Sequence, residues 1–168
     1  MSLDGKIADV RGDVEWLHQI PNPDKSDYGY QEFFESIDCT LMGNATYKQV
    51  LGFDIEFPYK STDNYVITRD TRLTSDKYVT YISTNHIDKI AALKKSKGKN
   101  IWCIGGGELI AYLLQYQLLD EFRIYLMPIL LGSGIPLVGR LAEHCALKHS
   151  ETVTHSSGVI ELRYQLLS

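Results

Sequence analysis

The sequence predicts an α/β fold with a mostly parallel central sheet flanked by helices and followed by an antiparallel C-terminal β-hairpin. Three observations support this prediction. Short apolar runs alternate along the chain with segments of helical spacing. One such run, Asn100–Ile104, passes through three glycines into the helical segment Leu109–Leu114. Near the C-terminus, strand-like segments at 146–154 and 159–167 enclose Ser156-Ser157-Gly158, which is typical of a hairpin.

Short local patterns set the positions of the other elements. Residues 1–26 are predicted to be mostly loop, with Trp16 as their large apolar anchor, because turn-forming glycines and prolines recur there. Ser26-Asp27 can cap a helix that presents several aromatic residues and Ile37 on one face. Further strands are expected at Cys39–Met42, Asn64–Thr68, Tyr78–Ile82 and Phe122–Met127, and further helices after Gly43 and after Ser83-Thr84-Asn85. Residues 1–168 are expected to form a single domain.

Composition and charge exclude several classes of protein. The 168 residues are 44% hydrophobic and carry a formal net charge of −4, which argues against a general nucleic-acid binder. No stretch is long and apolar enough to span a membrane, and Met1–Asp4 does not resemble a secretory signal, so we expect a cytoplasmic protein. Cys39 and Cys103 lie in apolar runs and are expected to be buried free thiols. Neither the cysteines nor the histidines have the spacing of a metal site.

Three predicted strand ends carry residues suited to a phosphate-bearing ligand. They are Met42–Thr46, Thr68–Asp70 and Gly105–Gly107. In a parallel sheet, ligands collect at the carboxyl ends of the strands, where glycines allow close approach and helix N-termini offer free N–H groups. Together the three ends favour a nucleotide cofactor. Taken singly, Gly105–Gly107 could equally be a tight turn that binds nothing, and Arg69 could form a surface salt bridge with Asp70 or a neighbour.

Asp27 is the carboxylate with the clearest chemical potential. It is expected to open a helix beside aromatic residues, where a partly desolvated acid could bind a polar heterocycle or relay a proton. A helix cap or a favourable first-turn charge is an equally good interpretation.

Five segments in this order resemble the dihydrofolate-reductase-like superfamily, and within it the C-terminal reductase domain of the bifunctional riboflavin-biosynthesis enzymes, the RibD C-terminal domain. These segments are Ser2–Ala8, Met42–Tyr47, Ile104–Leu109, Leu118–Glu121 and Pro128–Gly134. The resemblance covers nearly the whole chain. It implies a dihydrofolate-reductase-like fold, a small-molecule substrate, a homodimer and the use of NADPH as cofactor. The superfamily's usual first strand is not recognisable before Ser2.

The resemblance also implies a set of site residues. Gly105, Gly106 and Gly107 would hold the pyrophosphate of NADPH, with Ile104, Glu108 and Leu109 as neighbouring cofactor contacts. Gly43, Asn44, Ala45 and Thr46 would hold the adenosine end together with Thr68 and Arg69, and Arg69 could pair with the 2′-phosphate. Ile7, Ala8 and Trp16 would lie on the nicotinamide side. Asp27 would be the catalytic acid, and Asp4, Asp27 and Gln31 would contact the substrate.

The nearest named activity is the reduction of 5-amino-6-(5-phosphoribosylamino)uracil in riboflavin biosynthesis. Two positions differ from the usual family pattern, because Asn44 replaces an arginine and Ile104 replaces an acidic residue. A dihydrofolate or pterin reductase and a non-catalytic nucleotide-binding protein of the same fold therefore stay open as alternatives. A flavin-binding module is disfavoured by the motifs alone.

Overall fold

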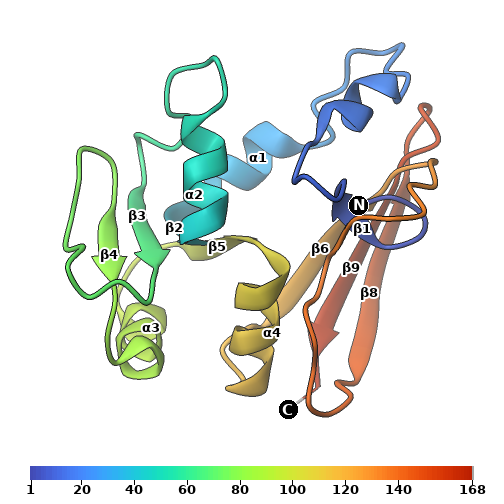
Figure 1. Cartoon of the computed structure of the whole chain (residues 1–168). Coiled ribbons are helices and arrows are strands. Elements are labelled where there is room, and N and C mark those ends of the chain that lie inside the picture. The colour runs from blue at the N-terminus through green and yellow to red at the C-terminus, as the bar shows by residue number, and fades with distance from the viewer. Residues whose placement is uncertain (168) are drawn as a thin grey trace. The chain divides into compact units, whose positions relative to one another are not determined.

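The chain divides into two compact units in a computed structural model that describes residues 1–167 (Figure 1). The terminal unit combines Met1–Gly29 with Leu113–Ser168, and the central unit is Tyr30–Tyr112. The predicted α/β class, with a parallel sheet, flanking helices and a C-terminal antiparallel hairpin, is confirmed. That all 168 residues act as a single domain stays a prediction.

The central unit is built on a parallel sheet of four strands in the order β4-β3-β2-β5. The innermost strands are the most apolar, and Leu41, Met42 and Val66 are almost completely buried. This burial on both faces explains why their sequences are apolar runs rather than alternating patterns. The strands are β2 (Ile37–Gly43), β3 (Asp63–Ile67), β4 (Thr80–Ile82) and β5 (Asn100–Gly105).

Helices accompany these strands along the chain. They are α1 (Tyr30–Glu35), α2 (Asn44–Leu51), α3 (His86–Lys95) and α4 (Gly107–Gln115), of which α4 begins in the central unit and ends in the terminal one. Helix α1 leads into β2, α2 joins β2 to β3, α3 joins β4 to β5, and α4 follows β5. Helix α1 is shorter than the sequence predicts, because Ile37 belongs to β2. Ser36 ends the helix: its backbone N–H and its hydroxyl both donate to the carbonyl of Phe33, at 3.0 and 2.6 Å.

Aromatic side chains dominate the core of the central unit. Tyr47 and Phe57 are buried among Met42, Val50, Val66 and Val79, and Ile104 packs against this cluster. The Tyr47 hydroxyl is satisfied by the carboxylate of Asp76 at 2.8 Å, and burial raises its pKa. The core therefore lies beside the C-terminal end of β2 and supports the start of α2.

The terminal unit contains a three-stranded antiparallel sheet and a smaller two-stranded one. The large sheet has the order β6-β9-β8, and the small one pairs β1 with β7. Residues 1–26, predicted to be mostly loop, contain β1 and a 3₁₀ helix, and β7 forms where the sequence analysis predicts no strand. Strands β1 and β7 are too short to give a periodic pattern in the sequence. The elements are β1 (Lys6–Ala8), η1 (Glu15–Gln19), β6 (Glu121–Leu126), β7 (Ile135–Pro136), β8 (Leu147–Thr154) and β9 (Ile160–Leu166).

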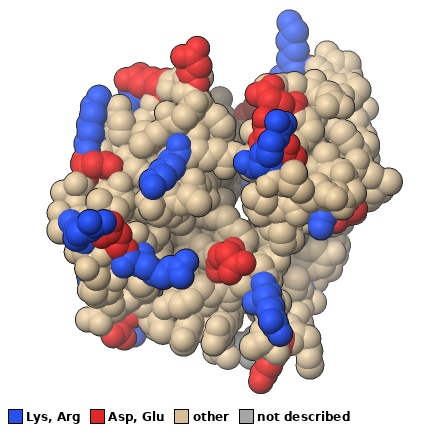
Figure 2. All heavy atoms as spheres, viewed as in Figure 1, with Lys and Arg blue, Asp and Glu red and all other residues tan. Residues whose placement is uncertain are grey.

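Charges of both signs are mixed on the face shown in Figure 2, where Lys and Arg lie among Asp and Glu. Among residues 1–167, no helix combines the length and the apolar character needed to cross a bilayer.

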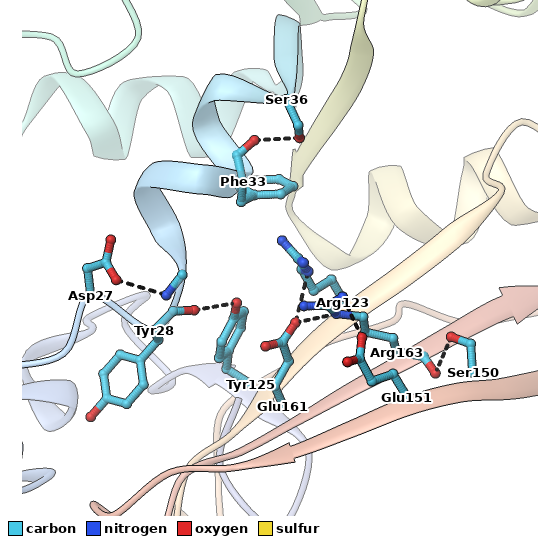
Figure 3. A network of polar contacts seen from close by, with 11 residues as sticks. Asp27, Tyr28, Phe33, Ser36, Arg123, Tyr125, Ser150, Glu151, Glu161 and Arg163 are labelled. Carbon is cyan, nitrogen blue, oxygen red and sulfur yellow. Dashed lines mark hydrogen bonds and ion pairs between the residues drawn. The ribbon is translucent and has the colours of Figure 1, made fainter.

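A buried carboxylate organises one face of the antiparallel sheet. Glu161 is only 3% exposed, and its Oε1 lies 2.9 Å from Nε of Arg123 and 2.6 Å from Nε of Arg163 (Figure 3). Arg163 also contacts Glu151 at 2.5 Å. Two guanidinium groups stand opposite each other on β6 and β9, and the shared carboxylate offsets their mutual repulsion.

Candidate functional site

The carboxyl ends of β2 and β5 meet in the central unit. The parallel register sets Met42 beside Gly105, and a Cβ atom added to Gly43 would lie only 3.7 Å from the carbonyl oxygen of Gly105. One added to Gly106 would lie 3.5 Å from the hydroxyl oxygen of Thr46. Gly43, Gly105 and Gly106 thus bring bare backbone together beside the hydroxyl of Thr46, and we call these four residues the glycine cradle.

Two helices begin at the glycine cradle. Helix α2 begins at Asn44 with Gly43 as its N-cap, and no side chain caps its free N–H groups. Helix α4 begins at Gly107, where Glu108 is exposed and Leu109 is buried in the protein. An uncapped helix N-terminus presents backbone donors and a partial positive charge, so it favours an anion.

Ala45 and Ile104 border the cradle in different ways. Ala45 is exposed in the first turn of α2, whereas Ile104 packs into the aromatic core. The side chain of Ile104 therefore has a packing role in addition to any contact with a ligand.

A cation, Arg69, follows the carboxyl end of β3. Arg69 is exposed and has no hydrogen bond or ion pair within the described part of the chain. The expected alternative, a salt bridge with Asp70, is not formed, because Asp70 binds Arg72 through two contacts of 2.8 and 2.7 Å. This pairing lowers the pKa of Asp70 to about 2.

Thr68 and His86 are linked beside this arginine. Thr68 is buried, and its carbonyl oxygen lies 3.2 Å from Nε2 of His86 at the start of α3. Sequence reasoning missed both His86 and the role of Arg72. A histidine directly after the Ser-Thr-Asn cap of a helix was an available signal for the former.

In the terminal unit, Asp4 joins two distant segments of the chain by hydrogen bonds. Its Oδ1 accepts hydrogen bonds from the hydroxyl of Ser2 and the N–H of Leu131, and its Oδ2 accepts one from the N–H of Gly132. These bonds lower the pKa of Asp4 to about 2, the bond from Leu131 contributing most. The carboxylate thus fixes the loop that precedes β7 against the N-terminal turn.

The residues expected on the nicotinamide side also lie in the terminal unit. Ile7 and Ala8 belong to β1, and Trp16 belongs to η1. Trp16 is 7% exposed, and its indole N–H is buried without a hydrogen-bond partner among the described residues. A buried donor of this kind is costly unless a ligand or water accepts from it.

Asp27 and Gln31 stand on either side of the unit boundary. Asp27 is exposed three residues before α1, and its Oδ1 accepts the N–H of Gly29 at 2.9 Å. Gln31 is exposed on α1 and bonds to Glu35 at 3.1 Å. Asp27 therefore shapes the turn that leads to the helix.

Two of the three free cysteines are unsuited to nucleophilic chemistry. Burial raises the pKa of both the Cys39 and the Cys103 thiol to about 12, so neither is a thiolate near neutral pH. Within residues 1–167, no group of three His, Cys, Asp or Glu side chains could hold a metal ion. A shallow polar cavity of about 240 Å³ lies at the opposite, N-terminal ends of β3 and β4, away from the glycine cradle.

Comparison with solved structures identifies the class of protein. The fold matches dihydrofolate reductase from Enterococcus faecalis, a structure complexed with NADP(H), with a TM-score of 0.70 at 14% identity, covering 100% of this chain and 93% of that one. A protein of Shewanella sp. PV-4 named for riboflavin biosynthesis matches with a TM-score of 0.88 at 34% identity, covering 100% of this chain and 96% of that one. The chain therefore has the α/β fold of the dihydrofolate-reductase-like reductases.

Comparison of the sequence with family models and relatives assigns the chain to one family within this fold class. Residues 1–160 match the model of the RibD C-terminal domain. Bacillus subtilis YwjB, described as uncharacterized, is 35% identical over 164 residues, which are 98% of this chain and 92% of YwjB. The chain belongs to the RibD C-terminal domain family, as its five sequence segments predicted.

Proposed function

We propose that the protein is an NADPH-dependent reductase whose central unit holds the phosphates of the cofactor. The observation that carries this proposal is the glycine cradle, where bare backbone at the ends of β2 and β5 meets the uncapped N-terminus of α2. Side chains at Gly43 or Gly106 would occupy the space that a pyrophosphate needs.

Arg69 is the residue that we propose selects NADPH over NADH. It is exposed at the end of β3 and has no partner among the described residues, so its guanidinium is available to pair with the 2′-phosphate that distinguishes NADPH from NADH. Thr68, held through its carbonyl by His86, fixes the backbone from which Arg69 extends.

The proposal also assigns residues to the nicotinamide and to the substrate. Bound NADPH would donate a hydride, and the protein would orient the rings and exclude water. Ile7, Ala8 and Trp16 are the proposed nicotinamide contacts, and the unpartnered indole N–H of Trp16 offers a donor to a polar ring atom. Asp27 is the proposed acid, whereas the bonds of Asp4 favour a structural role for that residue.

For the substrate, we propose a phosphoribosylaminopyrimidine whose ribose is reduced to the ribityl form. Membership of the RibD C-terminal domain family and 34% identity to the Shewanella protein support this choice. Pterin reduction is the second candidate, because the fold matches a dihydrofolate reductase and Asp27 lies three residues before α1. The carboxylate of Asp27 is exposed, however, and lacks the partial desolvation that the sequence analysis expects for this role. Loss of pterin turnover in Asp27→Asn would support pterin reduction, and absence of pterin binding would eliminate it.

The decisive test is a titration with NADPH that follows the fluorescence of Trp16 and Trp102. Saturable binding is expected, and turnover should follow as NADPH oxidation with the pyrimidine substrate. Absence of binding at millimolar NADPH would overturn the proposal. Binding without oxidation of NADPH by any candidate substrate would instead indicate the non-catalytic alternative.

The variant Gly43→Ala tests the cradle itself. The added Cβ fits within the protein, since its nearest neighbour would be 3.7 Å away, so stability should change by less than about 1 kcal/mol. NADPH affinity should fall at least about tenfold, because the methyl group takes the place of the phosphate. Gly52→Ala, at the other end of α2, is the control for affinity and should leave it unchanged. Its added Cβ would lie 3.3 Å from the carbonyl oxygen of Gln49, so the stability of this variant is measured alongside.

A further inference from the structure

Asp27 lies in a loop that is ordered by its own side chains. In residues 22–29, which we call the Asp27 loop, Asn22 exchanges two hydrogen bonds with the backbone of Ser26, at 2.8 and 2.9 Å. The hydroxyl of Ser26 accepts the N–H of Tyr28 at 3.0 Å, and Asp27 accepts the N–H of Gly29. These local bonds shape the loop but do not attach it to the rest of the terminal unit.

Tyr28 makes that attachment. Its φ angle is +55°, a left-handed conformation that is unfavourable for a tyrosine and persists only where the surroundings hold it. Its carbonyl accepts the hydroxyl of Tyr125 at 2.8 Å (Figure 3), and its own hydroxyl donates to Ser157 at 3.1 Å. Its ring packs edge-to-face on His155, with 4.9 Å between the ring centroids.

The partners of Tyr28 come mainly from the tip of the β8–β9 hairpin, His155–Gly158, which we call the hairpin tip. The N–H of His155 donates to the carbonyl of Val159 at 2.9 Å, and Val159 is completely buried. Ser156 also donates from its hydroxyl to the carboxylate of Asp24. The hairpin tip thus holds the Asp27 loop through two hydrogen bonds, one between Ser157 and Tyr28 and one between Ser156 and Asp24. We call these two contacts the grip.

We propose that the hairpin tip positions Asp27 for the reaction, with Tyr28 and Ser157 as positioning residues that touch neither cofactor nor substrate. Asp27 is the residue directly before Tyr28, so the backbone held by Tyr125 and Ser157 sets where its carboxylate stands. The effect on turnover rests on the proposed function. The grip itself is a property of the terminal unit and can be measured without any ligand.

The experiment combines hydrogen exchange with kinetics in the full chain. Tyr28→Phe and Ser157→Ala remove the same hydrogen bond from its two ends, and the double variant shows whether the two act as one contact. Each should speed amide exchange in the Asp27 loop about fivefold, the effect of one lost hydrogen bond, and the double variant should be no faster than Ser157→Ala. Ser150→Ala, which removes a bond to Arg163 elsewhere in the hairpin, is the matched control.

The kinetic arm separates positioning from general destabilisation. In Tyr28→Phe, kcat/KM for the substrate should fall about threefold to tenfold while the dissociation constant of NADPH stays unchanged. In an Asp27→Asn background, Tyr28→Phe should have no further effect on turnover.

Unchanged exchange in both Tyr28→Phe and Ser157→Ala would overturn the proposal. An equal loss of turnover from Tyr28→Phe with and without Asp27 would also overturn it. A wild type that oxidises no NADPH contradicts the proposed function and the positioning of Asp27 for reaction, and the exchange data then decide whether the grip exists.

Discussion

Arg69 and Arg72 are separated by two residues but have different electrostatic surroundings. Arg72 donates two hydrogen bonds to the carboxylate of Asp70 in a bidentate ion pair. This pairing raises the pKa of Arg72 and neutralises its charge locally. Arg69 has no such partner among the described residues. An unpaired guanidinium at the carboxyl end of a parallel strand can bind an anion without first breaking an ion pair.

This difference predicts that Arg69→Gln weakens NADPH binding about tenfold and leaves NADH binding unchanged, because only NADPH carries the 2′-phosphate. Parallel titrations of the two cofactors measure the ratio directly. Arg72→Gln is the control, since it removes an equal charge three residues away and should leave the ratio of the two affinities as it is. An unaltered ratio in Arg69→Gln would remove Arg69 from the proposed site.

Asp4 predicts a pH dependence of stability. Its pKa is lowered from 3.8 to about 2 in the folded protein, so its contribution is complete above pH 4 and is lost as the pH falls toward 2. Asp4→Asn should therefore be less stable than the wild type at pH 7, and the difference should shrink between pH 4 and pH 2. Urea unfolding at several pH values measures this.

Asp54→Asn controls for the loss of one negative charge, because no hydrogen bond ties this exposed carboxylate within the described residues. A stability difference for Asp4→Asn that stays constant from pH 7 to pH 2 would contradict the assigned role of Asp4.

At the scale of elements, β1 and β7 form because two distant loops approach unusually closely. Gly134 stands where the chain enters β7, and a Cβ atom there would lie 2.3 Å from the carbonyl oxygen of Ala8. The opposing atom belongs to the backbone, so it cannot rotate away. The glycine is therefore required by the pairing of β1 with β7, which also holds Ile7 and Ala8 in place.

Gly134→Ala should destabilise the protein by at least about 2 kcal/mol, because the strands must separate to admit the methyl group. Chemical denaturation measures the change. Ser133→Ala, at the neighbouring exposed position, should change stability by less than about 0.5 kcal/mol. Similar stability of the two variants would show that the β1–β7 pairing contributes little to the folded state.

Across the whole molecule, the sequence predicted those elements whose structure depends on neighbouring residues. The run from Asn100 through the glycines into α4 was readable because burial, turn and helical spacing follow one another within 15 residues. The pairing of β1 with β7 and the hydrogen bond from the N–H of Leu131 to Asp4 join segments about 127 residues apart, and no periodicity encodes them. The sequence also does not show which arginine pairs with Asp70, since both Arg69 and Arg72 lie within reach of it along the chain.

Binding of NADPH should stabilise the molecule as a whole, and the glycine cradle determines which variants lose this effect. At a free concentration about 100 times the dissociation constant, mass action contributes about 2.7 kcal/mol, which for a chain of this size raises Tm by roughly 5 to 10 °C. Calorimetry of the wild type should show this shift with NADPH and a smaller one with NADH at equal concentration. Gly43→Ala should melt within a few degrees of the wild type without cofactor but respond weakly to NADPH, because its cradle is filled. Equal shifts for Gly43→Ala and the wild type would place the phosphates elsewhere.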